Sequence, residues 1–257
     1  MIKLKDLLYE GVYDTGIFKA VFMAGGPGSG KSYVASNLFG IPQKVNISVS
    51  GLKTVSSDAE FEHYLKKAGH SPKDLADYEK NNPELFVKLT SKDPESLRSR
   101  AKKTTILRQK GYMDAKLGMI IDKTGDDYKK IANQKRDLGL LGYDTYMVFV
   151  NTSLEIAQER NKTRDRVLPE KMVEKIWRDV QKNIGAFQRM FKGGFAIFDN
   201  SDTLDPDQAA KKFAPYVREY ADKWASSPIK NPLGKYWVKT QLKLKKAGIK
   251  WLNSKTY

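Results

Sequence analysis

Short apolar runs alternate with longer amphipathic segments along most of this chain. The apolar runs predict strands at Phe18–Ala24, Lys53–Ser57, Leu117–Asp122, Thr145–Asn151 and Phe195–Asp199. Between them, apolar residues recur at the three- and four-residue spacing of helices. Regular alternation of strands and helices is typical of βα units built on a parallel sheet. We therefore predict an α/β fold in three layers, with a mainly parallel five-stranded sheet between helices.

Several helical segments carry a recognisable start. Ser71-Pro72, Asp93-Pro94 and Asp205-Pro206 each place a capping side chain before a proline, which the first turn of a helix tolerates. The predicted helices are Lys31–Leu38, Ala59–Lys67, Pro94–Lys110, Asp127–Leu138, Leu154–Thr163, Pro169–Phe191 and Pro206–Trp224. Together with the strands they predict a main domain over residues 17–225, preceded by an arm over 1–16 and interrupted by a helical insertion over 59–116.

The composition changes after residue 225. Residues 226–257 contain eight lysines and no acidic residue, and Pro228 and Pro232 stand at the entrance. This pattern predicts a linker followed by a basic C-terminal appendage. Its lysines and aromatic residues suit nucleic acid or another polyanion. A helix that packs Trp237 and Trp251 against the core, or an arm for a protein partner, explains the same residues.

Charge and composition narrow the class of protein. The 257 residues include 46 Lys and Arg against 30 Asp and Glu, which gives a formal net charge of +16. Such an excess attracts polyanions without identifying one. The chain has no cysteine, so disulfides, a thiolate nucleophile and zinc-thiolate sites are excluded. No run is apolar enough to span a bilayer, and the first residues carry acids, so we expect a cytoplasmic protein without a membrane partner.

A phosphate-binding motif follows the first predicted strand. It fits the pattern G-x-x-x-x-G-K-[ST] at every fixed position. Glycines let successive backbone N–H groups surround the β-phosphate, the lysine reaches the β and γ oxygens, and the serine hydroxyl ligates Mg²⁺. The residues are Gly25, Gly26, Pro27, Gly28, Ser29, Gly30, Lys31 and Ser32. We therefore predict binding of a nucleoside triphosphate with Mg²⁺.

Two carboxylates follow strands at the same edge of the predicted sheet. Asp122 ends the third strand, where an acid beside the phosphate loop can hold Mg²⁺, although it can also cap the next turn. Asp58 follows the second strand, where it can serve catalysis or cap the helix predicted from Ala59. Position alone does not decide which carboxylate serves the metal and which acts as a base.

Arginines cluster after the fourth strand. Arg160 and Arg164 are four residues apart, the spacing of one helix face, and Arg166 precedes Pro169. A segment with several guanidinium groups can close over the γ-phosphate and stabilise charge in the transition state. A solvated basic helix face is the alternative.

In their order along the chain, these motifs resemble those of the zeta-toxin and polynucleotide-kinase group of phosphate-loop kinases. The resemblance covers about residues 18–224 and implies a P-loop NTPase fold. It also implies a kinase that uses ATP and Mg²⁺ to phosphorylate a hydroxyl on a nucleic-acid end, a nucleotide sugar or a small metabolite. The motifs are Gly25–Ser32, Asp58, Ile120–Gly125, Arg160–Pro169 and Phe195–Ser201.

The resemblance also implies roles for individual residues. Asp58 would take the proton from the acceptor hydroxyl, and Arg160, Arg164 and Arg166 would belong to a lid. The turn Asp199-Asn200 would lie near the adenine, although such a turn also forms without a ligand. Two alternative functions remain. The protein could be an NTPase without an acceptor, or a nucleotide-binding assembly protein that holds a polyanion by its basic tail.

One position departs from the group's pattern. Nucleic-acid kinases of this group tend to carry an arginine three residues after the catalytic aspartate, where this chain has Phe61. The acceptor site has therefore diverged. The predicted helix at Pro94–Lys110 is basic, so its arginines and lysines either grip a phosphorylated acceptor or form a solvated face. The two histidines, His63 and His70, lack the spacing of metal or nucleophile sites.

Overall fold

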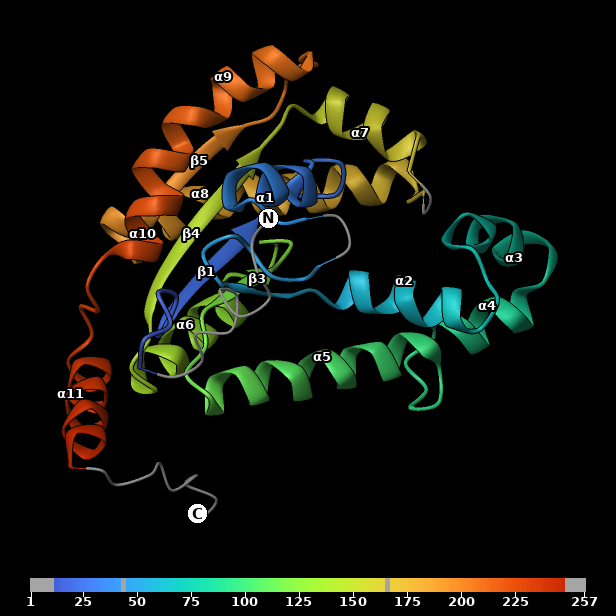
Figure 1. Ribbon diagram of the computed structural model, residues 1–257. Coiled ribbons are helices and arrows are strands. Elements are labelled where there is room, and N and C mark those ends of the chain that lie inside the picture. Colours follow the sequence, from blue (N-terminus) through green and yellow to red (C-terminus); the bar gives the residue numbers. More distant parts are fainter. Residues whose placement is uncertain (1–11, 43–44, 165–166, 248–257) are drawn as a thin grey trace.

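A parallel sheet forms the centre of the protein (Figure 1). The structure is a computed structural model that describes residues 12–42, 45–164 and 167–247. Its sheet has five strands in the order β2-β3-β1-β4-β5, and all neighbouring strands are parallel. Every predicted strand is present, and the α/β fold of the P-loop NTPase type is confirmed. The strands are β1 (Lys19–Ala24), β2 (Lys53–Val55), β3 (Met119–Asp122), β4 (Asp144–Asn151) and β5 (Phe195–Asp199).

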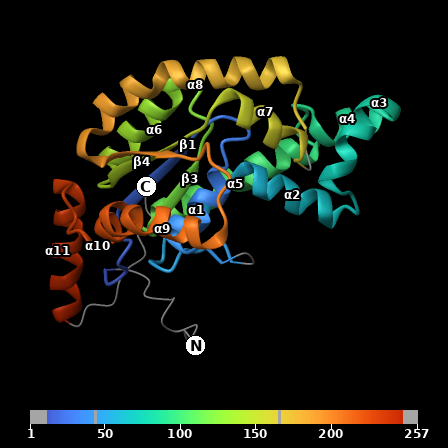
Figure 2. The ribbon, with the colours of Figure 1, turned by 90° about the horizontal axis from the view of Figure 1, so that it is seen from above.

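Helices cover both faces of the sheet (Figure 2). Because side chains alternate along a strand, Val21 of β1 packs with α1, α9 and α10, whereas Phe22 packs with α6 and α8. The helices of the main domain are α1 (Lys31–Phe39), α6 (Tyr128–Leu140), α7 (Leu154–Lys162), α8 (Glu170–Phe191), α9 (Pro206–Tyr216) and α10 (Lys223–Ser226). The two apolar clusters hold the helices on the two faces of the sheet. The loops that follow the strands lie at its carboxyl edge.

A helical insertion between β2 and β3 extends from one side of the sheet (Figure 1). Its helices α2 and α5 lie side by side, and Phe61, Leu65 and Ala101 contribute to an apolar cluster of its own. The helices are α2 (Ser57–Lys67), α3 (Leu75–Asn81), α4 (Pro83–Thr90) and α5 (Leu97–Asp114). The short helices α3 and α4 were not predicted individually, because neither is long enough to show a clear period.

The predicted start of the long insertion helix at Asp93-Pro94 is wrong. The Asp93 carboxylate accepts a hydrogen bond from the backbone N–H of Glu95 at 2.8 Å and so forms a turn. Helix α5 begins at Leu97, because Ser96 is its N-cap and accepts from the N–H of Ser99 at 3.1 Å. The pair Ser71-Pro72 does begin a short 3₁₀ helix, and Asp205 caps α9 as predicted.

The helix predicted over Pro206–Trp224 is divided into three parts. A π-helical turn at Val217–Asp222 separates α9 from α10. Pro215 lies in the last turn of α9, where it has no N–H to donate to the preceding turn. Most π-helical segments are such single turns within longer helices.

The basic C-terminal segment contains a helix, α11 (Pro232–Lys246). Trp237 of this helix packs edge-to-face on Phe18, with 5.4 Å between the ring centroids. Trp237 and Val238 thereby join the apolar cluster on one face of the sheet. The alternative in which a helix packs Trp237 against the core is thus observed, while Trp251 lies outside the described residues.

A buried ion pair anchors the segment that leads into α11. The Lys19 ammonium and the Asp144 carboxylate, at the amino ends of β1 and β4, lie 2.9 Å apart, and both side chains are buried. Asp144 also accepts from the backbone N–H groups of Lys230 and Asn231, each at 2.8 Å. The anchor holds α11 at the amino edge of the sheet, roughly 20 Å from the carboxyl edge by the rise of a six-residue strand.

Candidate active site

The phosphate loop connects β1 to α1 at the carboxyl edge of the sheet. Gly28 has φ of 77°, and a Cβ there would lie 2.2 Å from the carbonyl oxygen of Ala157 in α7. Gly30 has φ of 79°, and a Cβ there would lie 2.3 Å from the Asn200 side-chain nitrogen. Glycine is required at both positions, because the left-handed backbone and the close contacts leave no room for a side chain.

Lys31 is the first residue of α1 and turns back over the loop. Its ammonium donates to the backbone carbonyls of Gly25 at 2.7 Å and Gly26 at 3.3 Å. Desolvation lowers the pKa of Lys31; Asp122 opposes this shift and Arg164 adds to it. The charges of Asp122 and Arg164, both predicted for the same site, thus act on the Lys31 ammonium.

Asp122 has the geometry of a ligand for a hard cation. Its Oδ2 accepts from the Ser56 hydroxyl at 3.1 Å. Its Oδ1 is buried and has no hydrogen-bond partner among the described residues. A cavity of about 190 Å³ brings Asp122 together with Lys31, Ser32 and Ser56. Carboxylate and hydroxyl oxygens are the ligands that Mg²⁺ prefers, so Ser32 and Asp122 fit a magnesium ion.

Asp58 lies in the first turn of α2, half-exposed. The N-cap of this helix is Ser56, whose hydroxyl accepts from the N–H of Ala59 at 3.4 Å. The alternative in which Asp58 caps the helix is therefore wrong, because the helix begins one residue before it. Asp58 instead pairs with Arg98 of α5, with 2.8 Å between Oδ1 and Nη2. Ser56 was not singled out from the sequence, where the signal was a serine beside a strand end. Arg98 belongs to the basic helix expected either to grip an acceptor phosphate or to face solvent, and its pairing with Asp58 was not expected.

A second cavity joins Asp58 to the predicted lid. Its volume is about 270 Å³, and its lining includes Asp58 and Glu62 of α2 together with Thr163 and Arg164 beyond the end of α7. The structure thus brings together Asp58 and Arg164, and both lie close enough to Lys31 to act on its pKa, in opposite directions. Arg166 lies outside the described residues.

Arg160 contacts the chain after β5. Its guanidinium donates to the backbone carbonyls of Asn200 at 2.6 Å and Asp202 at 2.9 Å. Helix α7 ends at Lys162, so Arg160 and Arg164 do not share a helix face as the spacing predicted. In this arrangement Arg160 fixes a turn beside the phosphate loop, and Arg164 is the described arginine that lines the cavity.

The turn after β5 supports the phosphate loop. The Asp199 carboxylate accepts from the N–H of Ser201 at 3.1 Å and from its hydroxyl at 2.7 Å, which forms an Asx turn. The buried Asn200 amide donates to the carbonyl of Ser29 at 2.9 Å. The observed contact of Asn200 is therefore with the loop backbone.

Other chemistry is absent from the described part of the chain. No group of three or more histidine, cysteine or acidic side chains is placed to hold a metal ion among these residues. His70 lies 3.3 Å from the Tyr78 hydroxyl, an ordinary structural contact. Within residues 12–42, 45–164 and 167–247, no helix combines the length and the apolar character needed to cross a bilayer.

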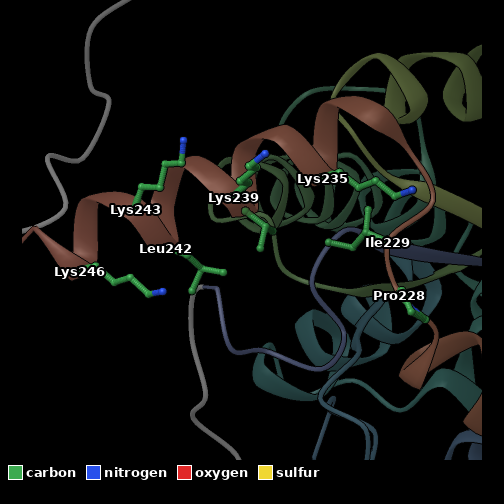
Figure 3. A pocket seen from close by; sticks show the side chains of 8 residues that line it. Pro228, Ile229, Lys235, Lys239, Leu242, Lys243 and Lys246 are labelled. Carbon is green, nitrogen blue, oxygen red and sulfur yellow. The ribbon is translucent and has the colours of Figure 1, made fainter.

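A larger cavity lies along α11, away from the phosphate loop (Figure 3). Its volume is about 540 Å³, and apolar side chains such as Ile229, Val238 and Leu242 form part of its lining. Lys235, Lys239 and Lys243 line it at intervals of four residues along the helix. None of the described residues that line this groove carries a carboxylate or a hydroxyl.

The chain is similar to several solved structures at low sequence identity. Similar solved structures include a gluconokinase from Sinorhizobium meliloti 1021, with 13% identity over 82% of this chain and 99% of that one and a TM-score of 0.44. The structure of the PezAT chromosomal toxin-antitoxin system of Streptococcus pneumoniae matches with 12% identity over 93% and 91%, at a TM-score of 0.44. Shikimate kinase from Acinetobacter baumannii matches with 12% identity over 94% and 100%, at 0.35.

No curated protein sequence matches the chain. The family comparison is decisive, because the profile described as AAA domain matches residues 21–186, from β1 and the phosphate loop into α8. The match spans more than half of the 257 residues, and the chain therefore belongs to this AAA domain family.

Proposed function

We propose that this protein is an ATP- and Mg²⁺-dependent kinase that transfers the γ-phosphoryl group to a hydroxyl acceptor. The observation that carries the proposal is the cavity shared by Asp58 and Arg164. An NTPase needs only a water molecule beside the γ-phosphate, whereas a kinase needs a space for an acceptor next to a base. The order of the motifs supports a place near the zeta-toxin and polynucleotide-kinase group.

Each residue has a distinct task in the proposed reaction. Lys31 leaves its carbonyl contacts and binds the β and γ oxygens, and the loop backbone holds the β-phosphate. Asp58 accepts the proton of the attacking hydroxyl, and Arg164 stabilises charge on the transferring group. Ser32 and Asp122 would hold Mg²⁺, which neutralises charge on the phosphate oxygens when it is bound. Arg166 would complete the lid.

The turn at Asp199-Asn200 is proposed to lie beside the adenine. Its position against the carbonyl of Ser29 supports this assignment, because the turn is fixed to the phosphate loop. Arg160 donates to the carbonyl of Asn200 in the same turn, and so it would position the nucleotide indirectly.

Labelled ATP separates the proposed kinase from the alternatives. The protein is incubated with γ-labelled ATP, with and without a mixture of hydroxyl compounds, and label is followed in free phosphate and in organic product. Transfer into an added hydroxyl compound, lost in Lys31→Ala, is the expected result. Phosphate release that no acceptor changes would identify an NTPase. Binding without turnover would favour the nucleotide-binding assembly protein.

Polyanion binding by α11 is a second proposal. Lys235, Lys239 and Lys243 recur every fourth residue, which places them along one side of the helix (Figure 3). Such a row can neutralise the phosphates of a nucleic acid. Because Trp237 packs on the core, base stacking on that ring is not part of this proposal.

A further inference from the structure

The arginines of α5 are committed to α2. Arg98 pairs with Asp58, donates to the backbone carbonyl of Ser57 at 3.1 Å, and lies 5.2 Å from the ring centroid of Phe61. Arg108 pairs with Glu60 at 2.6 Å. These contacts hold the two long helices of the insertion together. These arginines therefore do not form a free row of guanidinium groups for an acceptor, while Lys102, Lys103 and Lys110 of the same helix are exposed.

The acceptor-side cavity has a different lining. Four of its residues, Asp58, Phe61, Glu62 and Leu65, come from α2. Their spacing of three, four and seven residues places them on one face of the helix. Pro72 and Leu75 add apolar surface, and Thr163 and Arg164 come from the residues directly after α7. No arginine or lysine of α5 is among the residues that line it.

The lining of this cavity carries charges of both signs. Arg164 follows α7, whose Ala157 lies against Gly28 of the phosphate loop, so this arginine reaches the cavity from the element that borders the loop. Asp58 and Glu62 come from α2. With Arg164 assigned to the γ-phosphate, an acceptor in the same cavity meets two carboxylates and apolar side chains.

We propose that the acceptor is a small, unphosphorylated polyhydroxy compound, neutral or carrying an amine, bound through Asp58 and Glu62. This inference rests on the proposed kinase function. Carboxylate oxygens accept hydrogen bonds from hydroxyl and ammonium groups, whereas a phosphate at the same distance is repelled. The volume of about 270 Å³ suits a molecule of the size of a monosaccharide rather than a nucleic-acid end.

The chemical step is balanced. The acceptor oxygen forms a bond to the γ-phosphorus while the bond from that phosphorus to the β,γ-bridging oxygen breaks. The proton of the acceptor hydroxyl passes to Asp58, and the electron pair of the broken bond leaves with ADP. Glu62 does not take part in proton transfer; it holds a second hydroxyl or an amine and so determines which acceptor is selected.

The test uses matched pairs of acceptors with the full-length protein. Label transfer from ATP is measured to polyols, aldoses and amino sugars, to the phosphate ester of each, and to 5′-hydroxyl oligonucleotides. Transfer to unphosphorylated members at least tenfold faster than to their esters supports the proposal. Preference for the esters or the oligonucleotides overturns it while leaving the kinase function intact. No transfer to any member, with Lys31-dependent phosphate release retained, overturns the kinase function itself.

Glu62 provides the residue-level test. Glu62→Gln should raise the KM for the preferred acceptor about tenfold, because a charge-assisted hydrogen bond becomes a neutral one, with the KM for ATP unchanged. Glu62→Lys should invert the preference toward the phosphate ester. Glu84→Gln is the matched control, since Glu84 is exposed in the first turn of α4 outside the cavity. Equal acceptor KM values in Glu62→Gln and Glu84→Gln would overturn the assignment.

Discussion

Replacement of Asp58 by asparagine should separate chemistry from folding. Asp58 is half-exposed, and its pair with Arg98 at 2.8 Å is worth about 0.2–1 kcal/mol. Loss of a negative charge in the first turn of α2 costs about 0.3–1 kcal/mol more. Ser56 remains as the N-cap. The variant should therefore lose at most about 2 kcal/mol of a total stability that is typically 5–15 kcal/mol.

The effect on the reaction should be much larger. An amide cannot accept the proton of an attacking hydroxyl, so phosphoryl transfer should slow by about a hundredfold to ten-thousandfold. That loss corresponds to a barrier increase of about 2.7–5.4 kcal/mol. The affinity for ATP should change little, because the asparagine side chain keeps the size of the original and lies outside the cavity of Asp122.

The assay compares initial rates of label transfer at saturating ATP and Mg²⁺ with melting curves of the same samples. Asp207→Asn is the matched control, since Asp207 occupies the second position of α9 as Asp58 does in α2. It should show a similar small shift in melting temperature and an unchanged rate. Asp122→Asn should instead raise the Mg²⁺ requirement. An Asp58→Asn protein that works at near wild-type rate, or that more Mg²⁺ rescues, would refute the assignment of the base.

Three further outcomes are expected. Lys31→Ala should nearly abolish turnover. Because desolvation lowers the pKa of Lys31, ATP affinity should fall as pH rises through that lowered value. In ATP titrations at several pH values, Lys31→Arg should make the affinity less dependent on pH. Trp237→Ala should cost about 2 kcal/mol in urea unfolding, less than the 3–5 kcal/mol of a fully buried ring, and an unchanged midpoint would contradict the packing of α11. Lys235, Lys239 and Lys243 changed together to glutamine should weaken DNA binding most at low salt; equal binding across a salt titration would exclude the second proposal.

The sheet and the phosphate loop were predictable because few other residue types can occupy their positions. The strands are apolar runs, and β1 and β4 are buried on both of their faces. Continuous apolar runs of this kind differ clearly from the pattern of an amphipathic helix. In the loop, Gly28 and Gly30 occupy left-handed backbone against Ala157 and Asn200, where no other residue fits. A motif whose fixed positions each permit only one or two residues can be recognised without knowledge of its neighbours.

The acceptor side was not predictable in the same way. Arg98 is forty residues from Asp58, and only the packing of α5 on α2 brings the two together. A basic helix pattern is the same whether its arginines face water, a phosphate or a carboxylate. Arg160 illustrates the same point, because its spacing from Arg164 indicated a shared face that the end of α7 removes.

In the C-terminal segment, composition left more than one structure open. The change from mixed charge to lysine and aromatic residues at residue 226 suited a basic appendage or a helix packed on the core, and α11 does pack on the cluster around Phe18. The residues that indicate a packed C-terminal segment lie elsewhere in the chain: Lys19 and Asp144, at the starts of two adjacent buried strands. A charge in such a position is costly unless it is paired and hydrogen-bonded. The Lys19–Asp144 pair completes its hydrogen bonds with the backbone at residues 230 and 231, so the core itself requires the segment that leads into α11.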